Sequence, residues 1–371
     1  MKKVLIIVGT RPEAIKLVPI FTELRRSRRW LTLLVSTGQH REMLKSIFNF
    51  FEVKPDVDLA IMTKNQSLTG LTELLLEACS TVIDDHTPDL VIVQGDTTTA
   101  MVGALAAFYK RVKIAHVEAG LRSYDKTAPF PEEVNRRIIS TMADFHFAPT
   151  RTAAEALRQE QVTGKIKVVG NTVIDSLLFA TKKVSKNLNI FDAKYTHLID
   201  QYEKTILITG HRRESFGEGF ENICKAILTL AHAYPKVSFV YPVHLNPNVR
   251  SVVFSMLQGL RNVFLIDPVT YDDMVYLMTR SYLILTDSGG VQEEAPTLGK
   301  PVLIMRDKTE RPEGVKAGCS ILVGSSEKRI VRAVVGLMNN ARKYKSMTRV
   351  VNPYGKGDSS KKIVSFLNHE I

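Results

Sequence analysis

Short apolar runs alternate with longer amphipathic stretches along the first half of the chain. The runs have the length of strands and consist largely of Val, Ile and Leu, while the stretches between them follow the period of a helix. This pattern indicates buried parallel strands joined by crossover helices. We predict strands at Val4–Val8, Leu31–Val35, Leu90–Val93, Val112–Ala115, His146–Ala148 and Ile166–Val169.

The pattern stops in a polar passage from Lys182 to Lys204 and then starts again. A chain of 371 residues exceeds the length at which a single core usually divides. We therefore predict two doubly wound α/β domains, residues 1–172 and 173–356, with a C-terminal helix at 357–371 that packs back on the first domain. The strands predicted in the second domain are Thr205–Thr209, Val237–Tyr241, Val263–Ile266, Leu283–Leu285, Val302–Met305 and Ile321–Val323.

The charge of the chain adds a preference for anionic partners. Its 50 Lys and Arg residues exceed its 38 Asp and Glu residues, which gives a net charge of +12. A nucleotide, a nucleic acid and an anionic membrane would all suit such a charge. The densest basic run, Arg25–Arg29, ends a helical pattern, where cations complement the helix dipole, so it indicates a solvated face.

Cysteine spacing and hydropathy exclude several classes of protein. Cys79, Cys224 and Cys319 are far apart and form no CxxC pair, so they indicate neither a disulfide framework nor a structural zinc site. A reducing cytoplasm fits this usage. The N-terminal run Val4–Val8 is short and lacks a small-residue cleavage site, so it does not predict a signal peptide. No run has the length of a membrane span, and we expect no membrane insertion.

Unusual polar clusters follow the predicted strands. Ligands of doubly wound sheets bind beyond the carboxyl ends of the strands, so these clusters predict a binding site. Gly289 and Gly290 lie between an apolar run and a helical pattern, which suits a phosphate cradle, although a plain strand-to-helix turn has the same signature. The clusters are Gly9–Lys16, Gly95–Thr99, His116–Arg122, Gly210–Glu214, Thr286–Gly290 and Arg306–Glu313.

If the two domains face each other across a central cleft, these clusters bring cations and carboxylates to one site. Cations suit a diphosphate, and carboxylates suit proton transfer. Structural roles stay open: Asp96 and Asp287 as helix N-caps, Glu118 and Glu132 as ion-pair partners of Arg122 and Arg136, and His116 as a core residue. The candidates are Arg11, Lys16, His211, Arg212, Arg213, Arg306 and Arg311, with Asp96, Glu118 and Glu132.

Eight segments, taken in order, resemble the non-hydrolysing UDP-N-acetylglucosamine 2-epimerases nearly from end to end. They are Gly9–Lys16, Thr37–Met43, Gly95–Thr99, His116–Arg122, Pro129–Arg136, Gly210–Glu214, Thr286–Pro312 and Asn352–Gly355. The resemblance implies two Rossmann-like domains of glycosyltransferase-B type, a homodimer, and interconversion of UDP-GlcNAc with UDP-ManNAc. It implies no NAD, no other cofactor and no metal, and no nucleic acid as partner; the chain carries no GxGxxG motif.

The resemblance also assigns roles to individual residues. Asp96, Glu118 and Glu132 match the family's catalytic carboxylates, and His211 is carried over with them as a catalytic residue that holds the diphosphate. Uracil is expected near Pro268–Tyr271. The remaining substrate and UDP contacts would be Arg11, Lys16, Ser288, Gly289, Gly290, Glu294 for the ribose, Arg306 and Arg311.

A second, regulatory UDP-GlcNAc site is left in doubt by one departure from the family pattern. Asn65 stands where regulated members often have arginine, whose guanidinium would hold a phosphate. Alternatives to the main prediction are a hydrolysing relative that releases ManNAc, a C2 epimerase of a modified UDP-HexNAc, a glycosyltransferase of the same fold and a silent nucleotide-sugar binder. The possible regulatory contacts are Gln39, Gln66, Glu133, Arg212 and His244.

Overall fold

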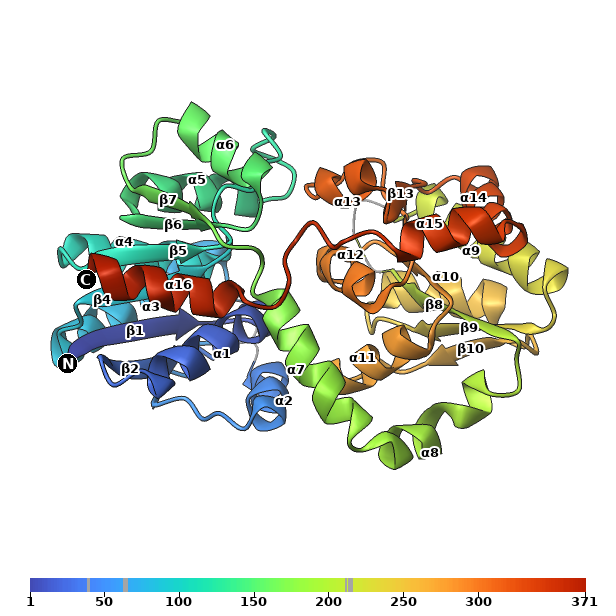
Figure 1. Cartoon of the computed structure of the whole chain (residues 1–371), viewed down its shortest axis with the longest axis horizontal. Helices are drawn as coiled ribbons and strands as arrows, with labels where there is room; N and C mark the ends of the chain where they lie inside the picture. Colours follow the sequence, from blue (N-terminus) through green and yellow to red (C-terminus); the bar gives the residue numbers. More distant parts are fainter. Residues whose placement is uncertain (39–40, 63–65, 211, 213–215) are drawn as a thin grey trace. The chain divides into compact units, whose positions relative to one another are not determined.

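The computed structural model of the chain describes residues 1–38, 41–62, 66–210, 212 and 216–371. It divides the chain into two compact units. Unit 1 comprises Met1–Ser176 with Tyr354–Ile371, and unit 2 comprises Leu177–Pro353. The ranges expected from the sequence were 1–172 with 357–371, and 173–356. Each unit contains one sheet of parallel strands (Figure 1).

Unit 1 has a sheet of seven strands in the order β3-β2-β1-β4-β5-β6-β7. The strands are β1 (Lys2–Val8), β2 (Trp30–Ser36), β3 (Val57–Asp58), β4 (Leu90–Gln94), β5 (Lys113–Val117), β6 (Phe145–Ala148) and β7 (Lys165–Val168). The helices that begin in this unit are α1 (Arg11–Arg26), α2 (Arg41–Phe51), α3 (Leu68–His86), α4 (Thr98–Tyr109), α5 (Glu132–Met142), α6 (Arg151–Gln159), α7 (Val173–Ser185) and α16 (Ser359–Glu370).

Unit 2 has a sheet of six strands in the order β10-β9-β8-β11-β12-β13. They are β8 (Lys204–Thr209), β9 (Val237–Pro242), β10 (Val263–Ile266), β11 (Leu283–Thr286), β12 (Val302–Ile304) and β13 (Ser320–Leu322). The helices are α8 (Leu188–Ile199), α9 (Glu218–Ala233), α10 (Pro247–Leu257), α11 (Tyr271–Arg280), α12 (Gly289–Glu294), the 3₁₀ helix η2 (Ala295–Leu298), α13 (Pro312–Ala317), α14 (Glu327–Asn339) and α15 (Ala341–Thr348).

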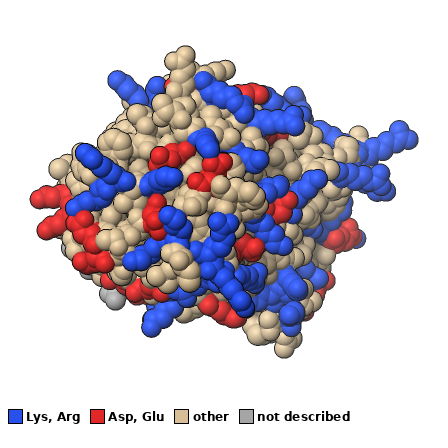
Figure 2. Space-filling view, turned by 60° about the vertical axis from the view of Figure 1, so that its left-hand side comes forward, with Lys and Arg blue, Asp and Glu red and all other residues tan. Residues whose placement is uncertain are grey.

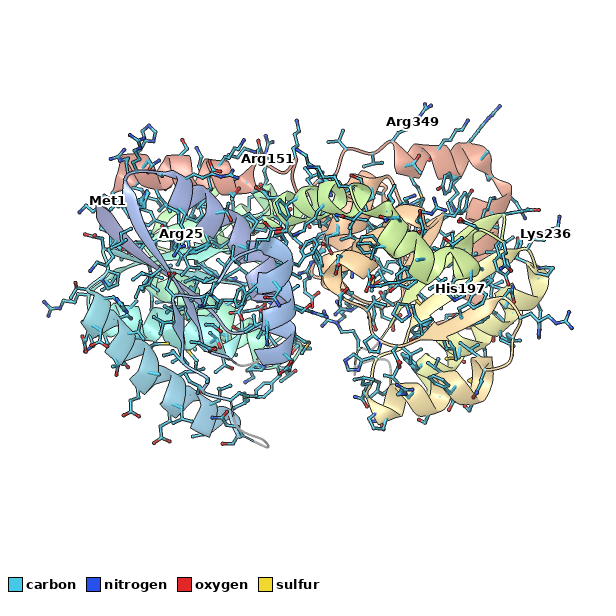
Figure 3. All side chains as sticks on the ribbon, turned by 90° about the horizontal axis from the view of Figure 1, so that it is seen from below. Met1, Arg25, Arg151, His197, Lys236 and Arg349 are labelled. Atoms are coloured by element: carbon cyan, nitrogen blue, oxygen red, sulfur yellow. The ribbon has the colours of Figure 1, made fainter. Side chains whose placement is uncertain are left out.

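The α/β class with two parallel sheets is confirmed, and every predicted strand range overlaps an observed strand. The central strands are buried on both faces, as Leu5, Ile7 and Val91 in unit 1 illustrate, which explains their uninterrupted apolar composition. Among the strands of the described residues, β3 alone was not predicted. It has 2 residues, Val57 and Asp58, too few to carry a period. Figure 3 draws the described side chains as sticks on the ribbon of each unit.

The C-terminal helix α16 packs on unit 1. The indole nitrogen of Trp30 donates to the side chain of Asn368 at 2.7 Å. The ring of Phe366 meets those of Phe145 and Phe147 edge-on, with centroids 6.1 and 5.7 Å away. Residues from the end of the chain therefore complete the core of the first unit (Figure 1).

The surface distributes the excess of basic residues among carboxylates. On the face drawn in Figure 2, Lys and Arg side chains lie with Asp and Glu side chains among them. In the run Arg25–Arg29, the guanidinium of Arg25 lies 2.6 Å from the carboxylate of Asp56. This exposed pair fits the predicted solvated face. Among the described helices, none is long and apolar enough to cross a membrane.

Candidate active site

The strand order gives each sheet one point at which the direction of winding reverses. In unit 1 this point lies between β1 and β4, and in unit 2 between β8 and β11. Loops that follow such neighbouring strands separate and leave room for a ligand. The loops here begin at Gly9 and Gly95 in unit 1 and at Gly210 and Asp287 in unit 2. Of the predicted site residues, Arg11, Asp96 and Ser288–Gly290 lie on or next to these loops.

The first loop of unit 1 is held by Glu13. Its carboxylate accepts hydrogen bonds from the backbone N–H groups of Gly9 and Thr10, at 3.1 and 2.6 Å, and from the Thr97 hydroxyl at 2.7 Å. Burial raises the pKa of Glu13 to about 7, although these hydrogen bonds act in the opposite direction. Glu13 thus caps helix α1 and connects the loops after β1 and β4.

Glu118 is held by its backbone conformation and by two side chains. It follows β5 with φ of +63°, a left-handed conformation that is uncommon for a residue with a side chain. Its Oε2 atom lies 2.5 Å from the ammonium of Lys16 and accepts a hydrogen bond of 2.7 Å from Asn171 Nδ2. All three residues are buried. The predicted cation and carboxylate therefore form one ion pair, and Arg122 pairs with Glu160 at 2.6 Å instead of Glu118.

Asp96 lies on the loop after β4 and is held from helix α5. The guanidinium of Arg136 forms an ion pair with its carboxylate, and Asn135 Nδ2 donates to its carbonyl at 2.9 Å. The N-cap of helix α4 is Thr97, whose hydroxyl accepts from Ala100 N at 3.0 Å, so Asp96 is not the cap. Its carboxylate is instead oriented by a buried cation.

Two neighbouring helix residues were also predicted to take part. Glu132 is the first residue of α5 and is partly exposed. Glu133 is 1% exposed and accepts from the N–H groups of Ser123 and Tyr124 and from Arg136, at 2.9, 3.2 and 3.1 Å. The alternative pairing of Arg136 with Glu132 is replaced by pairing with Asp96 and Glu133. Glu133 serves to fix this corner of the unit.

His116 lies in the core of unit 1, as the structural interpretation predicted. Its Nε2 atom lies 2.7 Å from the carbonyl oxygen of Gly95. Burial lowers the pKa of His116 to about 3 and that of its strand neighbour His146 to about 4. A neutral His116 donates this hydrogen bond and so supports the loop that carries Asp96.

The predicted phosphate loop of unit 2 joins β11 to α12. Ser288 is the N-cap residue, and its backbone N–H donates to the Thr286 hydroxyl at 2.9 Å. A Cβ atom at Gly289 would lie 2.6 Å from the Arg311 guanidinium, so a larger residue there would displace that side chain. A Cβ atom at Gly290 would meet nothing closer than 3.7 Å. Room is therefore present beside Gly290.

Acidic residues of α12 are engaged by neighbouring side chains. Glu293 lies 2.7 Å from Arg311 Nε, and Glu294 accepts a hydrogen bond of 2.8 Å from the Tyr271 hydroxyl. Burial raises the pKa of Tyr271, and Glu294 adds to this effect, so the phenol stays protonated. The hydrogen bond joins the expected ribose contact to the end of the expected uracil segment, Pro268–Tyr271.

The two arginines predicted as anion contacts lie beside Glu310. Arg306 Nη1 is 2.9 Å and Arg311 Nη1 is 3.6 Å from its carboxylate. Burial alone would raise the pKa of Glu310. The two guanidinium groups outweigh the effect of burial and lower this pKa to about 2. Glu293 and Glu310 therefore offset much of the positive charge that a diphosphate would otherwise meet here.

Several predicted residues lie outside those that the structure describes: Gln39, Asn65, His211 and Arg213. Among the other possible regulatory contacts, Arg212 donates its backbone N–H to Asp287 at 2.8 Å. His244 is exposed and accepts from the N–H of Asn246 at 3.1 Å, and Gln66 immediately precedes the N-cap of α3. The regulatory site stays a prediction.

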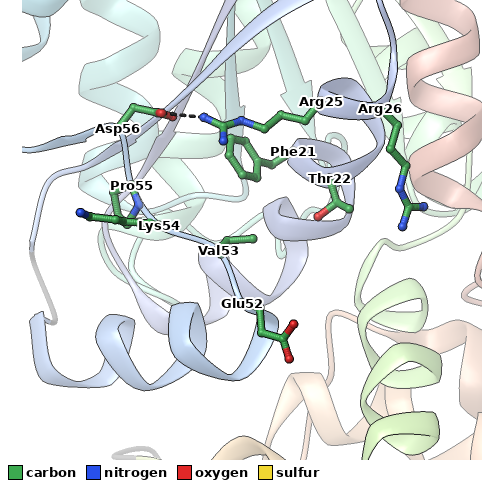
Figure 4. A pocket seen from close by; sticks show the side chains of 9 residues that line it. All are labelled: Phe21, Thr22, Arg25, Arg26, Glu52, Val53, Lys54, Pro55 and Asp56. Atoms are coloured by element: carbon green, nitrogen blue, oxygen red, sulfur yellow. Dashed lines mark hydrogen bonds and ion pairs between the residues drawn. The ribbon is translucent and has the colours of Figure 1, made fainter.

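A hollow in unit 1 lies away from the predicted residues. It has a volume of about 710 Å³ and runs between the C-terminal half of α1 and residues 52–56 (Figure 4). Phe21 and Val53 contribute apolar surface, and Arg25 and Asp56 form an ion pair across it. Arg11 and Lys16 lie toward the opposite end of the same helix. This hollow is therefore separate from the loops that carry the carboxylates.

Comparison with known proteins identifies the family. The profile of the UDP-N-acetylglucosamine 2-epimerases matches residues 22–368. The UDP-N-acetylglucosamine 2-epimerase of Campylobacter jejuni is 48% identical over 378 aligned positions, which cover 99% of this chain and 97% of the relative. The chain belongs to the UDP-N-acetylglucosamine 2-epimerase family. This match confirms the family resemblance that the sequence motifs indicate.

Solved structures of the family agree in fold. The UDP-GlcNAc 2-epimerase of Neisseria meningitidis bound to UDP-GlcNAc superposes on this chain with a TM-score of 0.95 at 46% identity, covering 99% of this chain and 100% of that one. The enzyme of Methanocaldococcus jannaschii in complex with UDP-GlcNAc and UDP gives 0.85 at 35% identity and covers 99% of each chain. The two-domain fold of glycosyltransferase-B type predicted for this family member is confirmed.

Sequence reasoning missed two residues that support the site, Glu13 and Asn171. Glu13 stands three residues after Thr10, the spacing of a capping box, which could have revealed its role. Asn171 has no comparable signal, because its contact with Glu118 joins positions 53 residues apart. Among the described residues, no group of three or more His, Cys, Asp or Glu side chains is arranged to hold a metal.

Proposed function

We propose that this protein interconverts UDP-N-acetylglucosamine and UDP-N-acetylmannosamine by inversion at C2 of the sugar. The observation that carries the proposal is the pairing of two predicted catalytic carboxylates with buried cations in unit 1, Glu118 with Lys16 and Asp96 with Arg136. Full-length similarity to enzymes of this activity supports the substrate. Carboxylates paired with buried cations at the carboxyl edge of a sheet suit proton transfer.

The proposed reaction proceeds through elimination and addition. The C2 proton is not acidified by an adjacent carbonyl, so a base removes it as the bond from C1 to the UDP oxygen breaks, which gives 2-acetamidoglucal and UDP. UDP then adds back to C1 while an acid delivers a proton to the other face of C2. Asp96, Glu118 and Glu132 are the proton-transfer groups, since a reaction on two faces requires more than one.

The diphosphate gains negative charge as the bond breaks. We assign His211, Arg11 and Lys16 to offset that charge, and Ser288, Gly289 and Gly290 to bind phosphate. Glu294 binds the ribose, with Arg306 and Arg311 as further anion contacts. The space beside Gly290 supports this assignment, because backbone N–H groups there can approach an anion closely.

Proton NMR of UDP-GlcNAc with the enzyme in deuterated water tests the proposal. UDP-ManNAc with deuterium at C2 is the expected product. Free ManNAc would show a hydrolysing enzyme instead. Absence of turnover with UDP-GlcNAc would favour a modified UDP-HexNAc as substrate, a glycosyltransferase that needs an acceptor, or a silent binder, and substrate panels with and without acceptors separate these.

We further propose that the enzyme acts as a cytoplasmic homodimer that supplies ManNAc-derived sugars for cell-surface polysaccharide. Exposed apolar side chains on three helices of unit 1 support self-association, because such groups gain from burial. Light scattering coupled to size exclusion measures the mass. The side chains are Leu68 and Leu74 on α3, Phe108 and Tyr109 on α4, and Val134 and Ile138 on α5, which are 38–63% exposed.

A further inference from the structure

Asn171 connects a predicted catalytic carboxylate to two other segments of unit 1. Its side-chain Nδ2 donates to Glu118 Oε2 at 2.7 Å, and its Oδ1 accepts from the N–H of Val173, the first residue of α7, at 3.0 Å. Its backbone N–H donates to the carbonyl of Tyr354 at 2.6 Å. Asn171 is 2% exposed, so these contacts lie away from solvent.

The backbone around Asn171 is packed closely enough to fix the side chain. Gly170 has φ of +93°, and a Cβ atom there would lie 2.6 Å from the Ser359 hydroxyl and 3.3 Å from Tyr354 O. The carboxylate of Asp175 accepts from the N–H groups of Ser359 and Ser360 at 3.2 and 2.9 Å. Contacts with the C-terminal segment from Tyr354 onward therefore fix the backbone at Asn171.

Glu118 needs such support because of its own geometry. With φ of +63° it occupies a sparsely populated conformation, and surrounding contacts must maintain it. Lys16 supplies charge from α1, and Asn171 supplies a neutral directional donor from the segment after β7; both act on Oε2. Donors to a carboxylate favour its ionised form and limit its rotation.

We propose that Asn171 is a positioning residue that orients the Glu118 carboxylate for proton transfer at C2, held in turn by the C-terminal segment at Tyr354. This inference rests on the proposed epimerase function. It also gives a role to the Asn352–Gly355 motif: Asn352 Nδ2 donates to Glu293 O at 2.7 Å in unit 2, and Tyr354 O accepts from Asn171 in unit 1. The motif supports a site segment in each unit.

Two substitutions separate the contact with Glu118 from the contact at the start of α7. In Asn171→Ser, the hydroxyl can still accept from Val173 N–H but is too short to reach Glu118. In Asn171→Asp, the acceptor stays but the donor is replaced by a carboxylate facing another carboxylate, so the pair would share a proton. Asn340→Ser is the matched control, since Asn340 caps α15 by accepting from Lys343 N–H at 2.9 Å.

The assay follows UDP-GlcNAc epimerisation by the full chain across pH, with UDP affinity by calorimetry. We expect Asn171→Ser to lower kcat by about 10–100-fold with KM changed only a few-fold, as supporting residues of a site do. In Asn171→Asp the acidic limb of the kcat profile should move to higher pH. UDP affinity should be unchanged in both Asn171 variants, and the kcat of Asn340→Ser should equal that of the wild type.

A wild-type kcat and pH profile in Asn171→Ser would overturn the positioning role. If Asn171→Asp does not fold, Asn171→Ser decides alone. A loss of kcat in Asn171→Ser that is accompanied by an equal loss of UDP affinity would also overturn it, because that pattern indicates general damage to the structure. Absence of turnover by the wild-type enzyme would overturn the proposed function itself, and this outcome is distinct from an active wild type with unaffected variants.

Discussion

The imidazole Nε2 of His116 lies 2.7 Å from the carbonyl oxygen of Gly95, the residue before Asp96. His116 is 0% exposed, and burial lowers its pKa from 6.5 to about 3. The buried neutral imidazole of His116 therefore supports the loop that carries Asp96, and it also makes the stability of the fold depend on pH.

Replacement of His116 by Gln should flatten the dependence of stability on pH. The folded pKa lies below the unfolded one, so between about pH 3 and 6.5 the unfolded chain binds more protons, and the wild type loses stability as pH falls through this window. The loss is on the order of a few kcal/mol. Gln keeps an N–H for Gly95 and does not ionise. Thermal unfolding of both proteins at pH 7.5 and 5.0 measures this loss of stability. An equal fall in melting temperature in the wild type and in His116→Gln would contradict the prediction.

Removal of each predicted carboxylate should slow turnover without preventing nucleotide binding. We expect Asp96→Asn, Glu118→Gln and Glu132→Gln each to reduce kcat by roughly 10² to 10⁴-fold, as proton-transfer groups do. UDP affinity, measured by calorimetry, should survive. Glu160→Gln, which removes the carboxylate paired with Arg122 at 2.6 Å, serves as a control for loss of a charge elsewhere in unit 1. Near-wild-type rates in all three variants would rule out the assignment.

The diphosphate assignment predicts weaker UDP binding in two variants. His211→Ala removes a charge-assisted contact, and Gly290→Val blocks the approach of an anion to the backbone. A Cβ atom at Gly290 meets no protein atom closer than 3.7 Å. A loss of UDP affinity in Gly290→Val would therefore report contact with the nucleotide and not damage to the fold. In Gly289→Ala, by contrast, a Cβ atom would lie 2.6 Å from the Arg311 guanidinium. That side chain would have to shift away from Glu293, so a small fall in the melting temperature is expected. Unchanged UDP affinity in the first two would place the nucleotide elsewhere.

Asn65 predicts weak regulation by substrate. Without a guanidinium at this position, a second UDP-GlcNAc loses a bidentate phosphate contact, so the rate curve should be close to hyperbolic. Conversion of UDP-ManNAc alone should also proceed without added UDP-GlcNAc. Steady-state rates in both directions measure this, with Asn65→Arg as the matched gain of function. A Hill coefficient clearly above one, or a lag removed by trace UDP-GlcNAc, would show that Gln39, Gln66, Glu133, Arg212 and His244 suffice.

The sequence alone determined the fold class and the family. Strands such as β1 and β11 are buried on both faces, so their apolar runs report the sheet without any knowledge of neighbours. Polar residues at the carboxyl ends of these strands, Asp96 and Glu118 among them, could be placed near one another because parallel strands end at the same edge. The fold class depends on local periodicity and the family on short motifs, and the linear chain contains both.

The tertiary structure decided which charges pair. The sequence left open whether Glu118 pairs with Arg122 and Glu132 with Arg136. The chain instead folds Glu118 against Lys16 and Asn171, and Arg136 against Asp96. Asn171 and Glu118 lie 53 residues apart in the sequence, and Arg136 and Asp96 lie 40 residues apart. Such pairing depends on how loops from different strands converge, and on the need of every buried charge for a counter-charge, neither of which appears in a local pattern.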